Sequence, residues 1–537
     1  MKRTALLLLL SSALLAGYAR LQGPSWLLGP VCLVPFLAAL ERTRALRTAC
    51  LLGAAQAVGF ALGALGWFPL AVQRYVGVSA WGAFALLALT APLLQPQFLA
   101  LALARTGLRR TGAGLAALGG ALAYVGVEWA APRLLDASLG YGLYPAEGLR
   151  QAADVAGVRG LTLALLLCNE ALWALAHARA WRRALALAAP LGLAALYGTW
   201  RLGTLEQVAR ARDGGEPGLR VGLVQANLTR YAELAEAEGT YGAVRTVLDT
   251  HYALSRALLQ APAPPELLVW PETVYPTTFG SPRSEAGAEL DAELRAFAHD
   301  TGVPLLFGTY AWEAGREYNA AVLLSAQEAA PAQGYRKVHP FPLSEYVPAW
   351  LDSPALRAWA PWLGTWSPGP GLQLLTLERP GRRTLRLAPL ICFDAAEPGL
   401  AAEGARAGAD LLVTLANDAW FAGGLGARQH LVVSAFRSIE TRLPQVRATP
   451  SGVSAEIDPL GRIVREAEPE RVQALGAQLR PGPLAPALAA AWGDWVGSAA
   501  LLALGLLVAT RLRLALTPGL SSEHPAQGTT SSAITPR

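Results

Sequence analysis

Residues 389–397 read PLICFDAAE, an apolar, β-type run that ends in a cysteine and passes at once into an acidic segment. The chain has 4 cysteines, and Cys392 is the only one outside the very apolar segments. A cysteine attacks as its thiolate, so a nucleophilic thiol needs a base or positive surroundings nearby. The alternative is that Cys392 is simply a small buried hydrophobe at the end of a strand.

Short β-rich runs surround Cys392 on both sides, between residues 215 and 480. They include LRVGLVQANL (219–228), ELLVWPET (266–273), VPLLFGTY (303–310), YNAAVLLS (318–325) and ADLLVTLAND (409–418). Helical patterns such as 241–260 and 286–300 lie between several of these runs. Strands that alternate with helices predict an α/β layered domain.

Outside this segment the chain is very apolar. The whole chain has a mean hydropathy of +0.32, and 16% of its residues are charged, against about 25% in an ordinary soluble protein. A helix needs roughly 20 apolar residues to cross a bilayer, and eight runs approach that length. They lie at about 4–19, 25–40, 48–68, 79–104, 112–131, 158–178, 184–200 and 495–514. We therefore expect a membrane α-helical bundle of about 8 transmembrane helices plus an α/β domain.

The predicted organisation has four parts. They are a seven-helix membrane region at 1–200, an α/β domain at 215–480, an eighth crossing at 490–514 and a disordered, polar tail at 515–537. The opening MKRTALLLLLSSALLAGYA also resembles a secretory signal peptide, which remains an alternative for the first crossing.

Basic residues predict the orientation, because cytoplasmic loops are rich in Lys and Arg. One set of loops carries Lys2, Arg3, Arg42, Arg44, Arg47, Arg105, Arg109, Arg110, Arg179, Arg182 and Arg183. The alternate loops carry only Arg20, Arg74, Arg133, Arg150 and Arg159. We expect both termini to be cytoplasmic and the α/β domain to lie on the outer side. The net charge of +6 then reflects orientation, and no nucleic-acid motif accompanies it.

Three stretches of the α/β domain carry candidate catalytic residues. VWPET places Glu272 directly after a strand, GYRKVHPFPLSEYVP offers Lys337 and Glu345, and PLICFDAAE offers Cys392. A carboxylate can take the thiol proton, and a lysine can stabilise the oxyanion of a tetrahedral intermediate. Glu, Lys and Cys therefore make an acyl-transfer set that needs neither histidine nor metal.

Simpler interpretations stand beside each candidate. Glu272 could be a turn or cap residue, and Lys337 could belong to a solvated basic patch with Arg336. His430 could be a partner of Cys392 or an ordinary polar residue on a helix face. The 6 histidines show no metal-ligand spacing, and FAGGLG at 421–426 lacks the P-loop lysine. We expect no metal and no cofactor.

Taken together, Glu272, Lys337 and Cys392 resemble the nitrilase superfamily, whose members carry Glu, Lys and Cys in this order. LANDAWF at 415–421 is similar to the stretch that follows the nucleophile there. KVHPFPLSEYVP, with seven crossings before the domain and one after it, resembles the apolipoprotein N-acyltransferases of bacterial inner membranes. The resemblance covers roughly residues 1–515.

The resemblance implies an αββα sandwich domain on a membrane base. It also implies transfer of an acyl chain from a phospholipid, through a Cys thioester, to the α-amino group of a diacylated apolipoprotein. Glu272 would be the base, Lys337 the oxyanion stabiliser, Cys392 the nucleophile and Glu345 a supporting carboxylate. Asp394 stands where the family often has Glu, one methylene longer.

Further residues are expected to contact substrate, and we expect the enzyme to be a monomer. The substrate-contact set is Trp270, Asp394, Asn417, Trp420, Phe421, Trp359 and Trp362. Trp359 and Trp362 belong to the Trp-rich segment 346–366, which we expect to form an arm that dips into the outer leaflet. The alternative for these tryptophans is the core of the domain.

Two other functions remain open. A membrane-tethered amidase of the nitrilase type, acting on a small carbon–nitrogen substrate, would use the same three residues. A transporter or scaffold would show charges within its membrane segments, and only Glu128 and Glu170, both near the ends of runs, are candidates.

Overall fold

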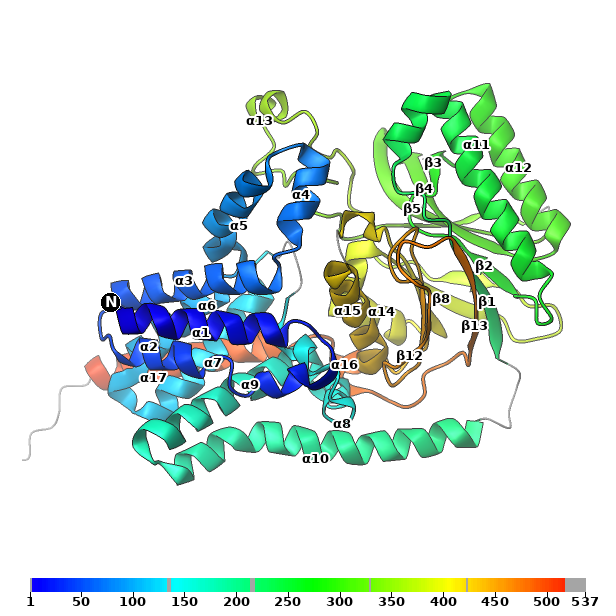
Figure 1. The fold of residues 1–537 in the computed structure, drawn as a ribbon. Coiled ribbons are helices and arrows are strands. Elements are labelled where there is room, and N and C mark those ends of the chain that lie inside the picture. Colours follow the sequence, from blue (N-terminus) through cyan, green and yellow to red (C-terminus); the bar gives the residue numbers. More distant parts are fainter. Residues whose placement is uncertain (1, 133–136, 213–217, 328–329, 422–423, 517–537) are drawn as a thin grey trace, which may run out of the picture.

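The protein has two parts that lie side by side (Figure 1). The fold comes from a computed structural model that describes residues 2–132, 137–212, 218–327, 330–421 and 424–516. Helices from both ends of the chain form one part, and the middle of the chain forms an α/β domain. The expected disordered tail at 515–537 lies outside the described residues from 517 onward, as does Arg133.

The helical part is built mainly from long apolar helices. They are α1 (Lys2–Tyr18), α2 (Val34–Glu41), α3 (Leu46–Ala64), α4 (Phe68–Val76), α5 (Ala80–Leu94), α6 (Gln97–Gly107), α7 (Ala113–Ala130), α9 (Ala153–Ala178), α10 (Trp181–Ala211) and α17 (Trp495–Leu516). Shorter helices connect them: η1 (Gly23–Leu28), η2 (Leu108–Thr111), η3 (Leu139–Leu143), α8 (Glu147–Arg150) and α16 (Leu488–Trp492).

Two of the expected crossings differ from a single helix. The run 25–40 is divided into η1 and α2, because Pro30 and Pro35 cannot donate the backbone hydrogen bonds of a continuous helix. The run 79–104 is divided into α5 and α6, which are bent by 47° at the break before Gln97. Pro96, at that break, is the N-cap of α6.

Length and composition identify fewer spanning helices than the sequence predicts. Among the described residues, 4 helices qualify as single spans, namely α3, α7, α9 and α10, and the bent pair α5 and α6 makes up to 5. In α17 the apolar helix counted over the described residues is Trp495–Arg511, which is shorter. The number of eight crossings therefore stays a prediction.

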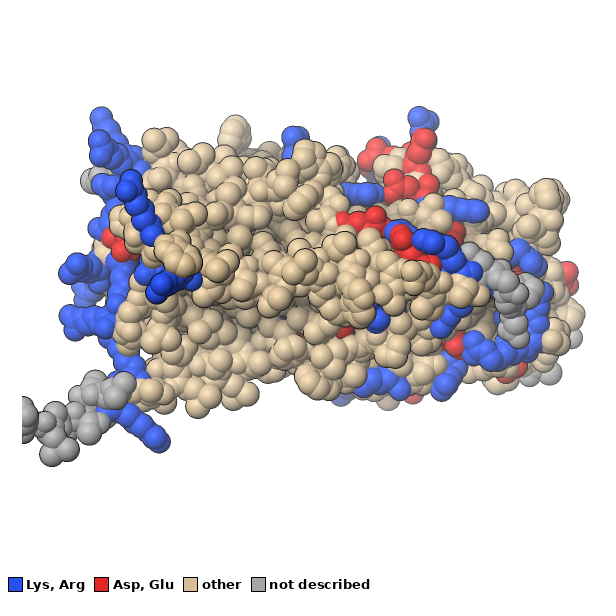
Figure 2. Space-filling view, turned by 90° about the horizontal axis from the view of Figure 1, so that it is seen from below, with Lys and Arg blue, Asp and Glu red and all other residues tan. Residues whose placement is uncertain are grey.

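The arginine-rich loops meet at one end of the helical part. Arg105 Nη1 lies 3.1 Å from Glu41 Oε2, Arg109 donates to the Leu40 carbonyl at 2.8 Å, and Arg511 donates to the Gly107 carbonyl. Figure 2 shows basic side chains gathered at this end, then a broad band of uncharged surface, then mixed charges over the α/β domain. This distribution agrees with a bilayer around the band and with the predicted orientation.

The α/β domain contains two mixed sheets. In the described residues, one sheet has the order β13-β1-β2-β4-β5-β6 with β3 paired to β4, and the other has the order β12-β11-β10-β9-β8-β7. The strands of the first are β1 (Leu219–Gln225), β2 (Leu267–Val269), β3 (Tyr275–Thr278), β4 (Leu305–Glu313), β5 (Arg316–Leu324), β6 (Gln333–Arg336) and β13 (Gln473–Leu479). Those of the second are β7 (Leu375–Leu377), β8 (Leu385–Ile391), β9 (Leu411–Leu415), β10 (Gln445–Ala448), β11 (Ala455–Ile457) and β12 (Ile463–Glu466).

Helices cover the outer face of each sheet, which gives the expected αββα sandwich (Figure 1). Side chains alternate along each strand. In β2, Leu267 and Val269 join the core between the sheets, whereas Leu268 joins the core under α11 (Tyr231–Leu259) and α12 (Glu285–Thr301). The second sheet is covered by α14 (Pro398–Arg406) and α15 (Leu425–Thr441).

Helix α15 joins the two parts of the protein. Its apolar residues, such as Leu431 and Phe436, share one buried cluster with the helical part. Polar residues also tie it to that part: Nη2 of its C-cap residue Arg442 lies 3.0 Å from Asp154 Oδ2, and Arg437 within the helix donates to the Tyr141 hydroxyl at 3.1 Å. Because these partners are buried, α15 holds the domain in a fixed position on the helices.

Candidate active site

Cys392 follows β8 directly and begins the short helix η5 (Cys392–Ala396). Its backbone φ is +49°, a left-handed conformation that costs an L-residue roughly 1–2 kcal/mol. Such strain persists only where the surroundings impose it, and it concentrates at functional sites. The sharp turn presents the thiol at the end of the strand.

Glu272 lies three residues beyond the last residue of β2 and is buried, with 4% of its surface exposed. Its Oε1 accepts a hydrogen bond from Asn319 at 2.7 Å and one from Lys337 Nζ at 3.1 Å. The loop that carries Glu272 lies directly on β4 at Gly308. A Cβ at Gly308 would come 2.4 Å from the Thr273 nitrogen, so only glycine leaves room for the loop.

Lys337 follows β6 directly, and its ammonium group lies between two carboxylates. Nζ donates to Glu272 Oε1 at 3.1 Å and to Glu345 Oε1 at 2.8 Å. Burial alone would lower the pKa of Lys337, but the charges of Glu272 and Glu345 outweigh it and raise this pKa well above its usual value. Lys337 is therefore a fixed cation.

Glu345 supports the lysine from the base of the segment 346–366. Its Oε2 accepts from the Phe341 backbone N–H at 2.6 Å, while Oε1 accepts from Lys337. Burial raises the pKa of Glu345, and the nearby charge of Glu272 acts in the same direction, while Lys337 lowers it. A Cβ at Gly364 would come 2.2 Å from the Glu345 carbonyl carbon, so the two backbones are in close contact.

The structure brings Glu272, Lys337 and Cys392 together. Burial raises the pKa of the Cys392 thiol well above its usual value, and the negative charges of Glu272 and Glu345 raise it further, against the effect of Lys337. The resting group is thus a neutral thiol beside a carboxylate and a cation. This arrangement can remove the thiol proton and stabilise a negative oxygen in the same step.

Asp394 is fully buried, and protein groups occupy both of its oxygens. Oδ2 accepts from the Tyr335 hydroxyl at 2.7 Å and from the Ile391 N–H at 3.1 Å, and Oδ1 accepts from the His339 N–H at 2.8 Å. These bonds tie the turn at Cys392 to the segment after Lys337. Asp394 therefore holds the segments of Cys392 and Lys337 together, and its oxygens are occupied by protein groups.

The other residues that we expected to contact substrate lie in separate parts of the structure. Trp270 is fully buried under α11 and donates to Ser255 Oγ at 2.9 Å, so it lies away from the thiol side of the sheet. Asn417 caps the short helix η6 (Asp418–Trp420), accepting from the Ala419 N–H at 3.2 Å. The side chain of Trp420 lies outside the described part of the structure.

Phe421 lies in a row of rings that links the helical part to the site. Its ring centroid is 4.9 Å from that of Trp67 and 5.4 Å from that of His430. His430 in turn approaches the backbone of Cys392, with Nε2 lying 3.2 Å from the Cys392 carbonyl oxygen. His430 therefore contacts both the Phe421 ring and the backbone of Cys392.

The segment 346–366 forms an arm that leaves the sandwich. It contains α13 (Pro354–Trp359), which Figure 1 shows away from the sheets, in the same part of the view as α4 and α5. Trp350, Trp359 and Trp362 are 84%, 80% and 53% exposed, so the alternative that they form the domain core is wrong for these three.

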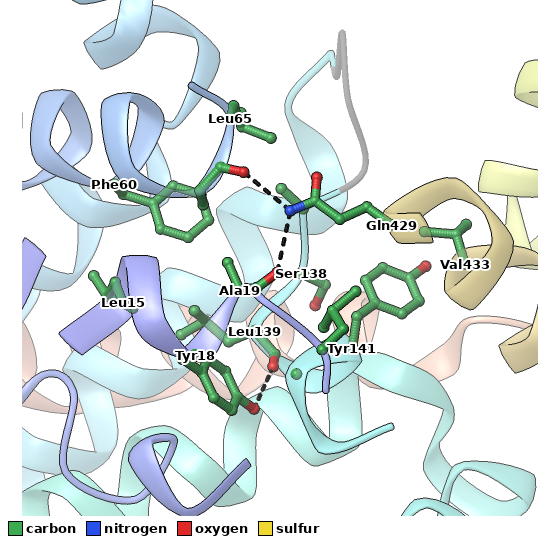
Figure 3. A pocket seen from close by; sticks show the side chains of 14 residues that line it. Leu15, Tyr18, Ala19, Phe60, Leu65, Ser138, Leu139, Tyr141, Gln429 and Val433 are labelled. Carbon is green, nitrogen blue, oxygen red and sulfur yellow. Dashed lines mark hydrogen bonds between the residues drawn. The ribbon is translucent and has the colours of Figure 1, made fainter. Parts of the chain in front are cut away.

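An apolar pocket lies where α15 meets the helical part (Figure 3). Its lining includes Leu15, Tyr18, Phe60 and Leu139 from that part and Gln429 and Val433 from α15. Gln429 donates to the carbonyl oxygens of Ala19 at 3.3 Å and Ala64 at 3.0 Å. These hydrogen bonds anchor α15 on the helical part at Gln429, which directly precedes His430.

Sequence reasoning did not single out Asn319, Asp418 or Arg447. Asn319 was identifiable as a polar residue within the apolar run YNAAVLLS, and Asp418 as the acidic end of ADLLVTLAND. Arg447 lies inside a buried strand, where a cation requires a partner, and it donates to Asp418 at 2.8 and 2.9 Å. In the described residues no group of three or more His, Cys, Asp or Glu side chains could hold a metal ion.

Comparisons with known proteins match both parts of the chain. The family model described as "Carbon-nitrogen hydrolase" matches residues 220–482. The family model described as "Apolipoprotein N-acyltransferase N-terminal domain" matches residues 12–171. The apolipoprotein N-acyltransferase of Allorhizobium ampelinum is 30% identical over 437 residues, 78% of either chain. That of Geobacter metallireducens is 30% identical over 358 residues, so this chain spans 64% of that relative's length. A solved amidase from Nesterenkonia sp. has 18% identity and a TM-score of 0.36, covering 52% of this chain and 97% of that one.

Proposed function

Because the chain belongs to the apolipoprotein N-acyltransferase family, we propose that it transfers an acyl chain from a membrane phospholipid to the α-amino group of a diacylated lipoprotein. The observation that carries the proposal is the grouping of buried Glu272 and Lys337 with the partly buried Cys392 at adjoining strand ends of the two sheets. It supports acyl transfer because it supplies a base, an oxyanion partner and a nucleophile together.

The first half of the proposed reaction forms a thioester. Glu272 takes the thiol proton as Cys392 attacks the ester carbonyl of the phospholipid. Lys337 stabilises the negative oxygen of the tetrahedral intermediate. When the intermediate collapses, the C–O bond breaks and the proton held by Glu272 goes to the departing lysophospholipid.

The second half transfers the acyl group to nitrogen. The free α-amino group of the lipoprotein attacks the thioester carbonyl, and Glu272 accepts the amine proton. The C–S bond then breaks, and the proton returns to the Cys392 sulfur. An amine attacks a thioester readily, and the amide product is the more stable linkage, so the transfer runs forward.

We further propose a bacterial inner-membrane location with the residue 215–480 domain on the outer side and both termini in the cytoplasm. The gathered basic side chains at one end of the helices support this orientation (Figure 2). A reporter fused after residue 300 should therefore score on the outer side. A cytoplasmic score there would contradict the orientation and the lipoprotein substrate with it.

A transfer assay with matched lipopeptides tests the function. The purified full-length protein, given phospholipid and a diacylated lipopeptide with a free N-terminus, should add one acyl chain to that lipopeptide, as mass spectrometry can measure. The same lipopeptide with an acetylated N-terminus should remain unchanged, because its nitrogen cannot attack the thioester. Release of free fatty acid or hydrolysis of small amides, without acylated lipopeptide, would instead indicate a hydrolase.

The arm yields a second prediction, since its exposed tryptophans suit a lipid interface. Replacing both Trp359 and Trp362 by Ser should lower kcat/KM for phospholipid by roughly tenfold or more through a raised KM, because large apolar contacts with lipid are lost. Thermal stability should stay near wild type, since both side chains are largely exposed. Trp181→Ser, which removes a tryptophan exposed at the start of α10, is the matched control. An unchanged KM would contradict an arm that contacts lipid.

A further inference from the structure

His430 makes a contact that the proposed reaction does not use. It lies on α15, 38 residues after Cys392, and its Nε2 is 3.2 Å from the Cys392 carbonyl oxygen. A carbonyl oxygen can only accept, so Nε2 carries the proton and donates it in this hydrogen bond. The contact therefore fixes the peptide group of the nucleophile itself.

A buried ion pair holds the histidine ring. Arg447 Nη2 lies 3.0 Å from His430 Nδ1 and donates to both oxygens of Asp418, at 2.8 and 2.9 Å. Asp418 Oδ1 also lies 3.0 Å from Nδ1. Arg447 and Asp418 are buried at 0% and 3% exposure, so the ring has fixed neighbours on the side opposite Cys392.

The charge of the ring follows from this environment. Burial lowers the pKa of His430, and the positive charge of Arg447 lowers it further, although Asp418 acts in the opposite direction. The neutral ring has one N–H to give. With that N–H on Nε2, Nδ1 accepts from Arg447 Nη2, which also donates to Asp418 Oδ1 and so offsets the repulsion between these two acceptors. Arg447 therefore favours the tautomer that bonds to Cys392.

The backbone of Cys392 needs such support. Its φ of +49° is unfavourable for a residue with a side chain, and the turn relaxes unless neighbouring groups hold it. On one side Asp394 accepts from the Ile391 N–H at 3.1 Å. On the other side His430 donates to the Cys392 carbonyl. Hydrogen bonds from two side chains therefore hold the backbone of the strained residue, one at the preceding N–H and one at its own carbonyl.

We propose that His430 is a positioning residue, which holds the strained backbone of Cys392 so that the thiol is aligned with Glu272 and Lys337. Within the proposed function, it affects formation of the thioester and leaves lipid binding unchanged. It acts through the peptide group of Cys392 and does not take the thiol proton. The contact also links the nucleophile to α15, which Gln429 anchors on the helical part.

Two variants separate the hydrogen bond from the shape of the ring. His430→Leu removes the donor at similar volume, and His430→Gln keeps a nitrogen donor at a similar reach. The readout is the rate at which iodoacetamide alkylates Cys392 in the full-length protein, measured on the Cys392 peptide by mass spectrometry. This assay needs no lipid, so it stands even if the proposed acyl transfer fails.

We expect His430→Leu to slow alkylation and thioester formation about tenfold, the worth of one hydrogen bond, with KM for phospholipid unchanged. His430→Gln should recover most of both rates. His251→Leu is the matched control, since His251 is also a buried histidine bonded to a backbone carbonyl, that of Val247 in its own helix. Any His251 variant that folds should alkylate at the wild-type rate.

Wild-type alkylation and acylation rates in His430→Leu would overturn the proposal. Failure of His430→Gln to exceed His430→Leu would overturn it too, because the ring and not the hydrogen bond would then matter. A loss in lipid KM with an unchanged alkylation rate would assign His430 to substrate binding and would equally contradict a positioning role.

Discussion

Replacing Cys392 by Ala is expected to abolish acyl transfer, with a loss of at least about 10⁴-fold, because the proposed reaction carries the acyl chain on the Cys392 sulfur. The variant should fold normally, since it loses one sulfur atom from a partly buried position. Incubation with phospholipid should give no acylated protein. The measurement is the transfer rate to a free-amine lipopeptide, together with the mass of the intact protein.

The three other cysteines serve as matched controls. Cys32, Cys50 and Cys168 lie in the helical part, and the Cys32 thiol donates to the Gly29 carbonyl at 3.3 Å. Alanine at any one of them should leave transfer intact. Full activity in Cys392→Ala, or an acyl group mapped to one of these three residues, would contradict the proposed nucleophile.

Replacing Lys337 by Met is expected to have the second largest effect, on activity and on stability. Removing the oxyanion partner should lower the acylation rate by about 10²–10³-fold. It also leaves Glu272 and Glu345 buried and facing each other without the cation between them, which should cost about 3–5 kcal/mol in the free energy of unfolding. Thermal unfolding of the purified protein measures the second effect.

The stability defect should depend on pH in a defined direction. In the folded protein the pKa of Glu345 is already raised, and loss of Lys337 removes a charge that lowers it. A carboxylate whose folded pKa exceeds its unfolded value binds more protons when folded, so stability falls as pH rises through that range. Lys337→Met should therefore be closer to wild type at acidic than at neutral pH.

A second substitution separates the two effects of Lys337→Met. Adding Glu345→Gln removes one of the two carboxylates, so Lys337→Met/Glu345→Gln should regain stability without regaining acyl transfer. A Lys337→Met protein that is equally stable at both pH values would contradict the buried charge cluster. Retained acylation at the wild-type rate would contradict Lys337 as the oxyanion partner.

Short, apolar strands separated by helical patterns predicted an α/β layered domain, and the resemblance to the nitrilase superfamily implied that its layers form an αββα sandwich. The three candidate catalytic residues each stand where a β-type run stops: Glu272 after β2, Lys337 after β6 and Cys392 after β8. Adjoining strand ends lie at one edge of a layered fold, so residues far apart in sequence meet there.

Strand alternation explains why Trp270 is not at the site. Val269 faces the core between the sheets, so Trp270, the next residue, points to the opposite face and packs under α11. The period of two is readable from LLVW at 267–270, and it places Trp270 on the face opposite to that of Val269.

Other features depend on tertiary contacts that no local pattern shows. The proximity of His430 to Cys392 needs α15 to pack beside η5, and the pairing of Arg447 with Asp418 needs β9 and β10 to be neighbours. The composition of an apolar run also does not show where a helix is interrupted. The run 25–40 has the composition of a membrane crossing, yet its prolines divide it into two helices. Composition predicts burial in lipid better than it predicts a continuous helix.

Mass spectrometry of the protein tests most directly whether Cys392 carries the acyl chain. After incubation with phospholipid alone, we expect one acyl group on the Cys392 peptide, removable by hydroxylamine and discharged by a diacylated lipopeptide with a free N-terminus. An N-acetylated lipopeptide should leave the adduct in place. A protein that transfers acyl chains without ever carrying one on Cys392 would contradict the account.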